Sequence, residues 1–264
     1  MKVGLIGCGN MAGAIMEGLI SSGTFRPEDI IASDKSREAL ENAAKRLGIH
    51  TTVNNSELVL ESELIILAVK PQVIESVISG IADVISEQKL IISIVAGQSI
   101  KRIEELFGQE IKLIRTMPNT PALVGAGMTA VCPNGNVTAN ELEYACRLLS
   151  SFGKAEVVSE KLMDAVVAVS GSAPAYVAMM IEAMADAAVL EGMPRAQAYQ
   201  FAEQAVYGTA KLLADKKMHP AVLKDMVCSP AGTTIEAVRV LEEKGFRSAI
   251  IEAMKACADV SAKL

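Results

Sequence analysis

VGLIGCGNMAGAIM, residues Val3–Met16, is the stretch that decides the fold. Its first residues are a short apolar run that leads through a glycine-rich turn into helical spacing, which predicts a buried strand, a tight turn and a helix. Gly7 permits the turn, Gly9 lets a phosphate group approach the backbone, and Ala12 lets the helix pack closely on the sheet. The first N–H groups of that helix lack partners and attract an anion. The pattern GxGxxA therefore predicts a dinucleotide-binding unit.

A second predicted strand, Ile30–Ser33, ends at Asp34. An acidic residue about 20 positions after the glycine turn is where a carboxylate that binds the adenosine ribose is expected. The alternative, a glycine turn that only connects a strand to a helix, leaves this carboxylate unexplained. Asp34 would repel a 2′-phosphate and favours NADH, whereas Lys35, Ser36 and Arg37 would hold that phosphate and favour NADPH.

Strand and helix patterns alternate over the first part of the chain. Apolar runs predict strands at 50–53, 64–69, 90–94, 111–115, 128–132 and 156–158, and helical spacing predicts helices at 36–47, 56–60, 72–85, 100–107 and 139–151. Such alternation is typical of a doubly wound, mostly parallel sheet, as in Rossmann-like domains. Polar residues and glycines fall at the expected carboxyl ends of the strands, where ligands bind in such sheets: Gly7–Ala12, Ser33–Arg37, Val69–Pro71, Ala96–Gly97 and Met117–Pro121.

Strand signals end near residue 159. The remaining chain predicts helices at 161–169, 174–191, 194–215, 220–227, 234–243 and 246–264. We therefore expect a dinucleotide-binding domain over 1–159 and an all-helical domain over 160–264. The helical half is rich in alanine and methionine, which leaves apolar area for a partner. Its most apolar segment, Ala173–Leu190, contains Glu182 and Asp186, and we expect a buried helix and not a membrane span.

Composition excludes several kinds of partner. The 264 residues carry a net charge of −6 without a basic block, which argues against nucleic acid and anionic membrane surfaces. The five cysteines show no CxxC spacing and only two histidines are present, so we expect no metal site. Scattered thiols and the lack of a signal-peptide pattern favour the cytoplasm.

A loop of small residues near the end of the chain, Asp225–Thr234, opens another helix. The N–H groups of Gly232, Thr233 and Thr234 would lack acceptors within that helix and would suit a carboxylate, with hydroxyl groups beside them, among them that of Ser229. An ordinary capped helix explains the composition of this loop equally well.

Six motifs together resemble the pyrroline-5-carboxylate reductase family. They are GCGNMA from Gly7, AVKPQ (Ala68–Gln72), SIVAG (Ser93–Gly97), RTMPNTP (Arg115–Pro121), SGSAPAY (Ser170–Tyr176) and DMVCSPAGTTIEAVRVLE (Asp225–Glu242), and the resemblance runs from Lys2 to about Ala258. Ala231 stands where the family usually has glycine. The resemblance implies NAD(P)H-dependent reduction of the C5 imine carbon of pyrroline-5-carboxylate to give L-proline, with NADPH often preferred.

The resemblance also implies roles for particular residues. Thr234 would lie near the imine nitrogen as the catalytic residue, in a substrate-binding loop formed by Ser229, Gly232, Thr233 and Thr234. The substrate would bind as an iminium ion that is already protonated, because neither SGSAPAY nor the loop before Thr234 offers an obvious histidine, lysine or glutamate to donate a proton. The expected coenzyme-binding residues come from seven segments: Gly7, Gly9, Asn10, Met11, Ala12, Ser33, Asp34, Lys35, Asn55, Ala68, Val69, Lys70, Ala96, Gly97, Asn119, Thr120 and Ser172. A solvated lysine at a strand end is the alternative for Lys70.

Family members form dimers through interwoven helices and many assemble into decamers, so the resemblance implies a homo-oligomer. Three other classes compete, of which a purely structural interaction protein leaves the polar residues clustered at the strand ends unexplained. A β-hydroxyacid dehydrogenase needs a lysine acid preceded four positions earlier by asparagine, but Tyr207 precedes Lys211. A coenzyme-binding regulator without catalysis would be expected to have lost the Ser229–Thr234 loop, which is intact apart from Ala231.

Overall fold

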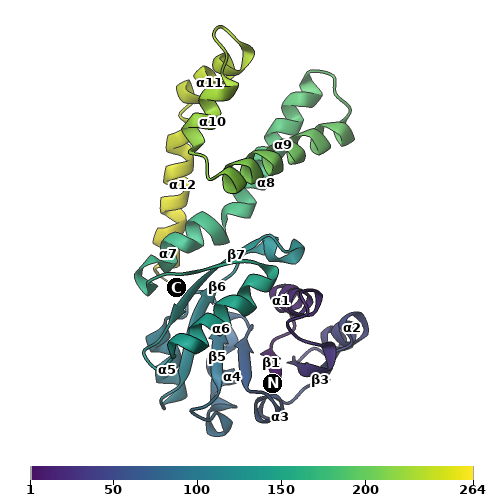
Figure 1. Ribbon diagram of the computed structural model, residues 1–264, viewed down its shortest axis with the longest axis vertical. Coiled ribbons are helices and arrows are strands. Elements are labelled where there is room, and N and C mark those ends of the chain that lie inside the picture. The colour runs from purple at the N-terminus through teal and green to yellow at the C-terminus, as the bar shows by residue number, and fades with distance from the viewer. Residues whose placement is uncertain (1, 264) are drawn as a thin grey trace. The chain divides into compact units, whose positions relative to one another are not determined.

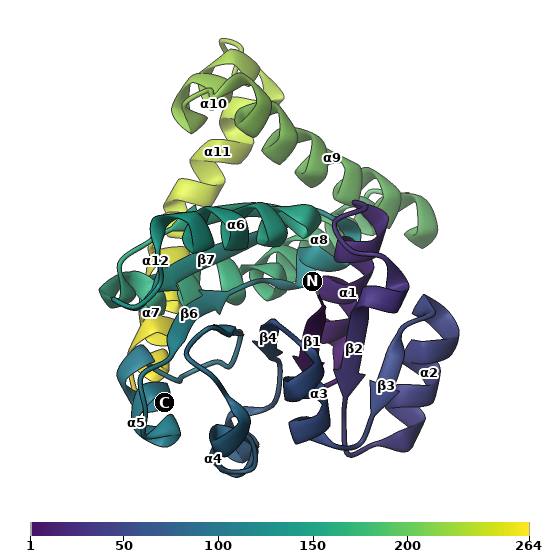
Figure 2. The ribbon, with the colours of Figure 1, turned by 60° about the horizontal axis from the view of Figure 1, so that its bottom comes forward.

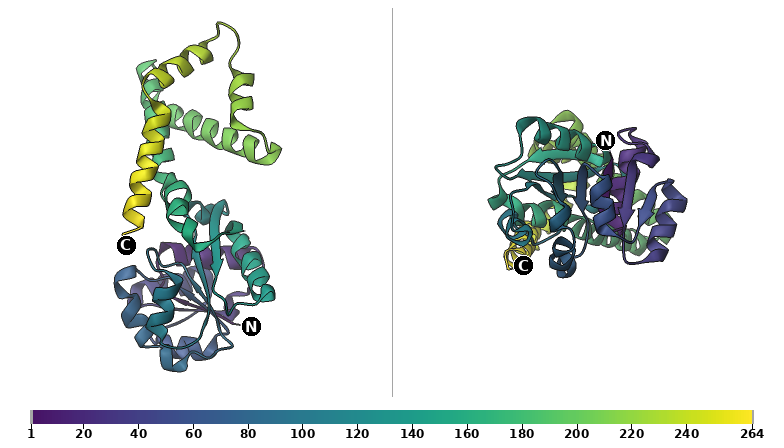
Figure 3. Two further views of the ribbon diagram at one scale, coloured as in Figure 1. Left: turned by 90° about the vertical axis from the view of Figure 1, so that its left-hand side faces the viewer. Right: turned by 90° about the horizontal axis from the view of Figure 1, so that it is seen from below.

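A computed structural model describes residues 2–263 of the chain. Eight strands form one sheet in the order β3-β2-β1-β4-β5-β6-β7-β8 (Figure 1). Their bounds are β1 Val3–Ile6, β2 Ile30–Ser33, β3 His50–Thr52, β4 Leu64–Leu67, β5 Leu90–Ser93, β6 Lys112–Met117, β7 Gly127–Pro133 and β8 Gly153–Val157. All neighbouring strands are parallel except β6 and β7. The predicted doubly wound, mostly parallel sheet is confirmed, and Figure 3 shows its strands fanned by their twist.

Helices cover both faces of this sheet (Figure 2). Side chains of α1 (Asn10–Ser21), α2 (Arg37–Leu47) and α6 (Ala139–Leu149) join one hydrophobic cluster. Those of α3 (Asn55–Glu61), α4 (Ile74–Ser79) and α5 (Ile100–Phe107) join another. Successive strand residues point to opposite faces, so the continuous apolar runs of the central strands serve both clusters.

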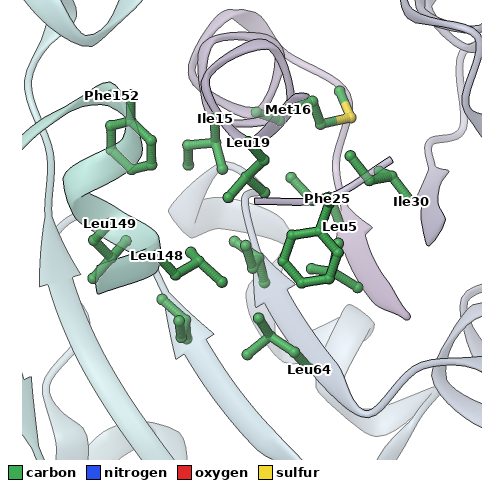
Figure 4. Packing of buried hydrophobic residues seen from close by; sticks show 14 of the residues in the cluster. Leu5, Ile15, Met16, Leu19, Phe25, Ile30, Leu64, Leu148, Leu149 and Phe152 are labelled. Carbon is green, nitrogen blue, oxygen red and sulfur yellow. The ribbon is translucent and has the colours of Figure 1, made fainter. Parts of the chain in front are cut away.

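The first cluster is built around α1. Leu5 from β1 and Ile15 and Leu19 from α1 are fully buried, and Phe152 packs beside them (Figure 4). The helix α1 can approach Phe152 this closely because Gly18 has no side chain: a Cβ at Gly18 would lie 2.7 Å from the Phe152 Cβ. Burying such side chains contributes roughly 1.5–3 kcal/mol each. This packing fixes the start of α1 against the end of β1.

The described residues form two compact units. One runs to Ser172 and includes the residues from Cys257 onward, and the other is Ala173–Ala256. The helices that follow the sheet are α7 Met163–Val166, α8 Ala173–Leu190, α9 Arg195–Lys216, α10 Pro220–Val227, α11 Thr233–Glu243 and α12 Phe246–Ser261. The expected boundary between the two domains at residue 159 stays a prediction. The two compact units reflect how densely the residues pack and not which residues bind coenzyme or substrate.

In the second unit, α8 and α9 pack against each other. Ala185 of α8 and Ala198 and Ala202 of α9 are buried, since alanine lets two helices approach closely. The expectation that Ala173–Leu190 is a buried helix is wrong within this chain: Ala185 is its only buried residue, and Met179 is 68% exposed. By length and composition alone, the helical stretch Glu160–Leu190 would also pass as a membrane span.

Several predicted elements differ in detail. The single helix expected at 72–85 is α4 between two 3₁₀ turns, Pro71–Val73 and Ala82–Val84, because Pro71 starts a tight turn and Gly80 ends the helix. The helix expected at 161–169 is divided into a 3₁₀ turn, α7 and a π-helical turn, Val167–Gly171. A π-turn has no simple apolar periodicity, so the pattern could not predict it.

Candidate functional site

The sheet reverses its winding direction between β1 and β4. From β1 the chain proceeds to β2 and β3 on one side, and from β4 to β5 and β6 on the other. Loops diverge at such a switch point, and ligands bind in the crevice outside the carboxyl ends of the strands. The glycine turn after β1 and the segment Ala68–Lys70 after β4 both lie at this point.

Two glycines shape the turn after β1 in different ways. Gly7 has φ +103°, and a Cβ there would lie 2.4 Å from the carbonyl oxygen of Ala68. Its N–H donates to the Ser33 carbonyl oxygen at 2.8 Å, which ties the turn to β2. Gly9 has ordinary extended backbone and no atom within 4 Å of an added Cβ, so it faces open space. Gly7 is thus required for folding, whereas Gly9 leaves room for a ligand.

A cleft of about 280 Å³ lies at the switch point. It collects nine of the residues expected to bind the coenzyme: Gly7, Gly9, Ser33, Asp34, Lys35, Asn55, Ala68, Val69 and Lys70. These residues come from the ends of β1, β2 and β4 and the start of α3. The open space at Gly9 and the unpaired N–H groups at the start of α1 fit a pyrophosphate. The chain can therefore hold a dinucleotide here.

Polar side chains at the end of β2 brace the cleft. Asp34 accepts hydrogen bonds from the Cys8 N–H at 2.8 Å and from the Ser36 N–H at 2.9 Å. The fully buried Ser33 hydroxyl donates to Asn55 Oδ1 at 2.7 Å. This bond orients the amide of Asn55 so that its Nδ2 group is the end left for a ligand.

An apolar wall of the cleft was missed by sequence reasoning. Ile6, Val73 and Val77 line it, and Val73 is 37% exposed. The sequence shows the i, i+4 spacing of the two valines, but it does not indicate that they face a ligand cleft. A flat apolar surface next to ribose-binding groups suits an adenine ring.

The Cys8 thiol sits in the glycine turn, half-buried. Burial raises its pKa, and the Asp34 carboxylate raises it further, against a smaller opposing effect of Arg46. The thiol is therefore protonated at neutral pH and has little nucleophilic character. Cys8 contributes to the site through its backbone N–H.

The other expected coenzyme residues lie outside this cleft but at the same edge of the sheet. Asn10, Met11 and Ala12 begin α1, and Ala12 is buried against the core as expected. Ala96 and Gly97 follow β5, and Asn119 and Thr120 follow β6. Ser172 follows the π-turn, where its hydroxyl lies 3.2 Å from the Cys257 thiol.

The substrate loop belongs to the second compact unit. Thr233 and Thr234 are the first two residues of α11, so their N–H groups have no acceptor within the helix. The Gly232 N–H also has no acceptor within α11, but it donates to the Ser229 carbonyl oxygen at 3.1 Å in the turn before the helix. A Cβ at Gly232 would lie 2.3 Å from Ser229 Oγ, so a side chain at this position would displace the Ser229 hydroxyl.

Ala231 adopts the left-handed conformation, with φ +55°. With Pro230 before it and the bond from Gly232 to Ser229 closing the turn, the segment matches a type II turn. That turn places its third residue at positive φ, which normally selects glycine. A methyl group at this position costs roughly 1–2 kcal/mol.

A Rossmann-type sheet with a dinucleotide cleft at its switch point defines a nucleotide-dependent oxidoreductase. Residues 2–97 match the family model described as NADP oxidoreductase coenzyme F420-dependent, and residues 160–264 match pyrroline-5-carboxylate reductase dimerisation. The chain belongs to the pyrroline-5-carboxylate reductase family.

Relatives and solved structures support this over the whole chain. The pyrroline-5-carboxylate reductase of Escherichia coli K12 is 51% identical, covering 100% of this chain and 98% of its own, and that of Methanosarcina acetivorans is 43% identical, covering 100% and 97%. The Plasmodium falciparum enzyme, solved with NADP bound, superimposes with a TM-score of 0.90 at 32% identity, covering 100% and 97%. Similarity is therefore not confined to the dinucleotide-binding region.

Proposed function

We propose that this chain reduces L-1-pyrroline-5-carboxylate to L-proline with NAD(P)H, the last step of proline biosynthesis. The observation that carries the proposal is the convergence of nine expected coenzyme residues on one cleft at the switch point. Family membership over the full length supports the substrate. The bound coenzyme supplies a hydride for the C5 carbon of the imine.

Different residues of the cleft bind different parts of the coenzyme. The Gly9 backbone and the start of α1, including Asn10 and Met11, receive the pyrophosphate. Asn55 and the segment after β2 hold the adenosine ribose, with Lys35 placed for a 2′-phosphate, so NADPH is our preferred coenzyme. For the nicotinamide end we propose a surface formed by residues from the ends of β4, β5 and β6 and the π-turn: Ala68, Val69, Lys70, Ala96, Gly97, Thr120 and Ser172, with Asn119 supporting Ser172.

The loop before α11 recognises the substrate. The carboxylate of the substrate accepts hydrogen bonds from the N–H groups of Thr233 and Thr234. The Ser229 hydroxyl lies beside them, and Gly232 shapes the turn. The Thr234 hydroxyl orients the imine nitrogen. Because an imine that binds already protonated needs no acid from the protein, orientation is the main contribution of these residues.

The second half of the chain forms the subunit interface. Residues 160–264 match the dimerisation model, and helices of this part expose large apolar side chains such as Met179 and Ile251. We propose a homodimer with a coenzyme domain over 1–159 and a substrate and dimerisation domain over 160–264, with decamers as a further assembly. We further propose a cytoplasmic enzyme that uses neither a membrane nor nucleic acid, since the net charge is −6 and we expect the second subunit to cover α8.

Oxidation of NADH and NADPH on addition of pyrroline-5-carboxylate tests the function. We expect turnover with both coenzymes and faster rates with NADPH. Thr234→Ala should lower kcat/KM about 10- to 100-fold with coenzyme affinity unchanged, and Thr234→Ser should restore most of it. Absence of turnover with either coenzyme would defeat the proposal.

A further inference from the structure

One turn of π-helix, Val167–Gly171, lies between α7 and Ser172. The Ser172 N–H donates to the Val167 carbonyl oxygen at 2.8 Å, which spans five residues in place of four. Such turns are rare because they lack the favourable geometry of the α-helix, and they recur at functional sites. This one needs partners outside the helix to hold it.

Asn119, in the loop after β6, supplies those partners. Its Nδ2 group donates to the carbonyl oxygen of Ser170 at 3.3 Å and to the Ser170 hydroxyl at 3.2 Å. Its Oδ1 atom accepts from the Met128 N–H at 2.8 Å. A backbone N–H can only donate, so this third bond fixes which end of the amide faces the turn. Both hydrogen bonds that the Asn119 Nδ2 group donates therefore go to Ser170.

The sequence explains why the Ser170 carbonyl needs this donor. In an α-helix that carbonyl would accept from the N–H of the residue four positions on. That residue is Pro174, which has no N–H. The Asn119 amide supplies a donor to this carbonyl where Pro174 has none.

The far side of the turn is held from the C-terminal helix. The Cys257 thiol lies 3.2 Å from the Ser172 hydroxyl, and the Ser261 hydroxyl donates to Asp164 Oδ1 at 2.7 Å. All four residues belong to the same compact unit as the sheet. Ser170 and Ser172 are thus anchored to two different elements.

We propose that Asn119 is a positioning residue that sets the place of Ser172 and does not itself bind the coenzyme. This inference rests on the proposed function, in which Ser172 belongs to the surface for the nicotinamide end of the coenzyme. The hydrogen bonds of Asn119 go to Ser170 and Met128, so its effect on hydride transfer passes through the π-turn. Displacing Ser172 changes the geometry of the reacting atoms while leaving the rest of the cleft intact.

Asn119→Asp tests the inference, because it keeps the acceptor for Met128 and removes the donor to Ser170. We expect kcat to fall about 10- to 100-fold, with the dissociation constant of NAD(P)H within about twofold of the parent. The kinetic isotope effect with deuterated coenzyme should rise, and the Ser172 amide should exchange hydrogen faster. Asn119→Ala removes the donor without adding charge and should behave alike.

Asn136→Asp is the matched control. Asn136 Nδ2 also donates to a backbone carbonyl, that of Ile111, at 3.0 Å near the other end of β6. This variant should retain the parental kcat and isotope effect. An Asn119→Asp enzyme with unchanged kcat and isotope effect would reduce Asn119 to a structural role, and weakened coenzyme binding with unchanged kcat would make it a direct ligand; either result overturns the proposal.

The two proposals fail in different ways. If the parent does not turn over pyrroline-5-carboxylate, the proposed function fails. Exchange at the Ser172 amide would still report whether Asn119 holds the turn.

Discussion

Asp34 Oδ2 accepts a 2.8 Å hydrogen bond from the Cys8 N–H, so the carboxylate at the end of β2 is tied to the glycine turn after β1. Asp34 therefore braces the turn, in addition to the charge that the proposed function places near the ribose. Asp34→Asn should raise the ratio of kcat/KM for NADPH to that for NADH by about three- to tenfold, because a partly screened charge that opposes the 2′-phosphate is lost. Arg37→Ala should lower the same ratio. An unchanged ratio in the Asp34 variant would show that the carboxylate does not face the coenzyme.

The two glycines of the turn should respond differently to the same change. Gly9→Ala should fold with a free energy of unfolding within about 1 kcal/mol of the parent, since the methyl enters open space. Its dissociation constant for NAD(P)H should rise at least about tenfold. Gly7→Ala should lose about 3 kcal/mol or more, because the methyl meets the Ala68 carbonyl. Titration of coenzyme fluorescence and urea unfolding measure the pair, and parental coenzyme affinity in the Gly9 variant would contradict the placement of the pyrophosphate.

Ala231 should tolerate glycine but not a branched side chain. Ala231→Val should lower the free energy of unfolding by about 1–2 kcal/mol and raise KM for pyrroline-5-carboxylate, because a β-branched residue strongly disfavours positive φ. Ala231→Gly should stay within about 1 kcal/mol of the parent, because relief of strain is offset by the greater entropy of the unfolded chain. Equal stability and KM in all three proteins would show that the turn does not control the substrate loop.

The buried thiol of Cys132, on β7, predicts a dependence of stability on alkaline pH. Burial raises its pKa, and the Glu160 carboxylate adds to this, so the folded protein holds the proton more tightly than the unfolded chain. The contribution of this thiol to the free energy of unfolding is therefore fully present below about pH 8. It decreases as the pH rises further, because the unfolded chain loses the proton first. Cys132→Ala should flatten this fall by up to about 1.4 kcal/mol per pH unit. Burial also raises the pKa of Cys8 and Cys146, so part of the slope should remain. Identical slopes in parent and variant would refute the assignment.

The dinucleotide half was predictable because its patterns are local. The order of the strands and helices and the glycine turn follow from short stretches of sequence, and the strands lie within a few residues of their predicted bounds. The bond between Cys8 and Asp34 joins residues far apart in the chain, and neither spacing nor composition indicates it.

The helical half was less predictable for a physical reason. Continuous apolarity in Ala173–Leu190 was attributed to burial in one chain, but most of that surface is exposed there. The pattern of apolar residues indicates that a helix face is buried against another surface. It does not indicate whether that surface belongs to the same chain or to another subunit. The π-turn at Val167–Gly171 depends likewise on Asn119, which is distant in sequence.

The central claim is hydride transfer from the coenzyme to C5 of pyrroline-5-carboxylate. NADPH deuterated at the transferred position of the nicotinamide should be oxidised with substrate, and the product should be examined by NMR. Deuterium at C5 of L-proline is the predicted result. Proline without deuterium, or coenzyme oxidation without proline, would contradict it.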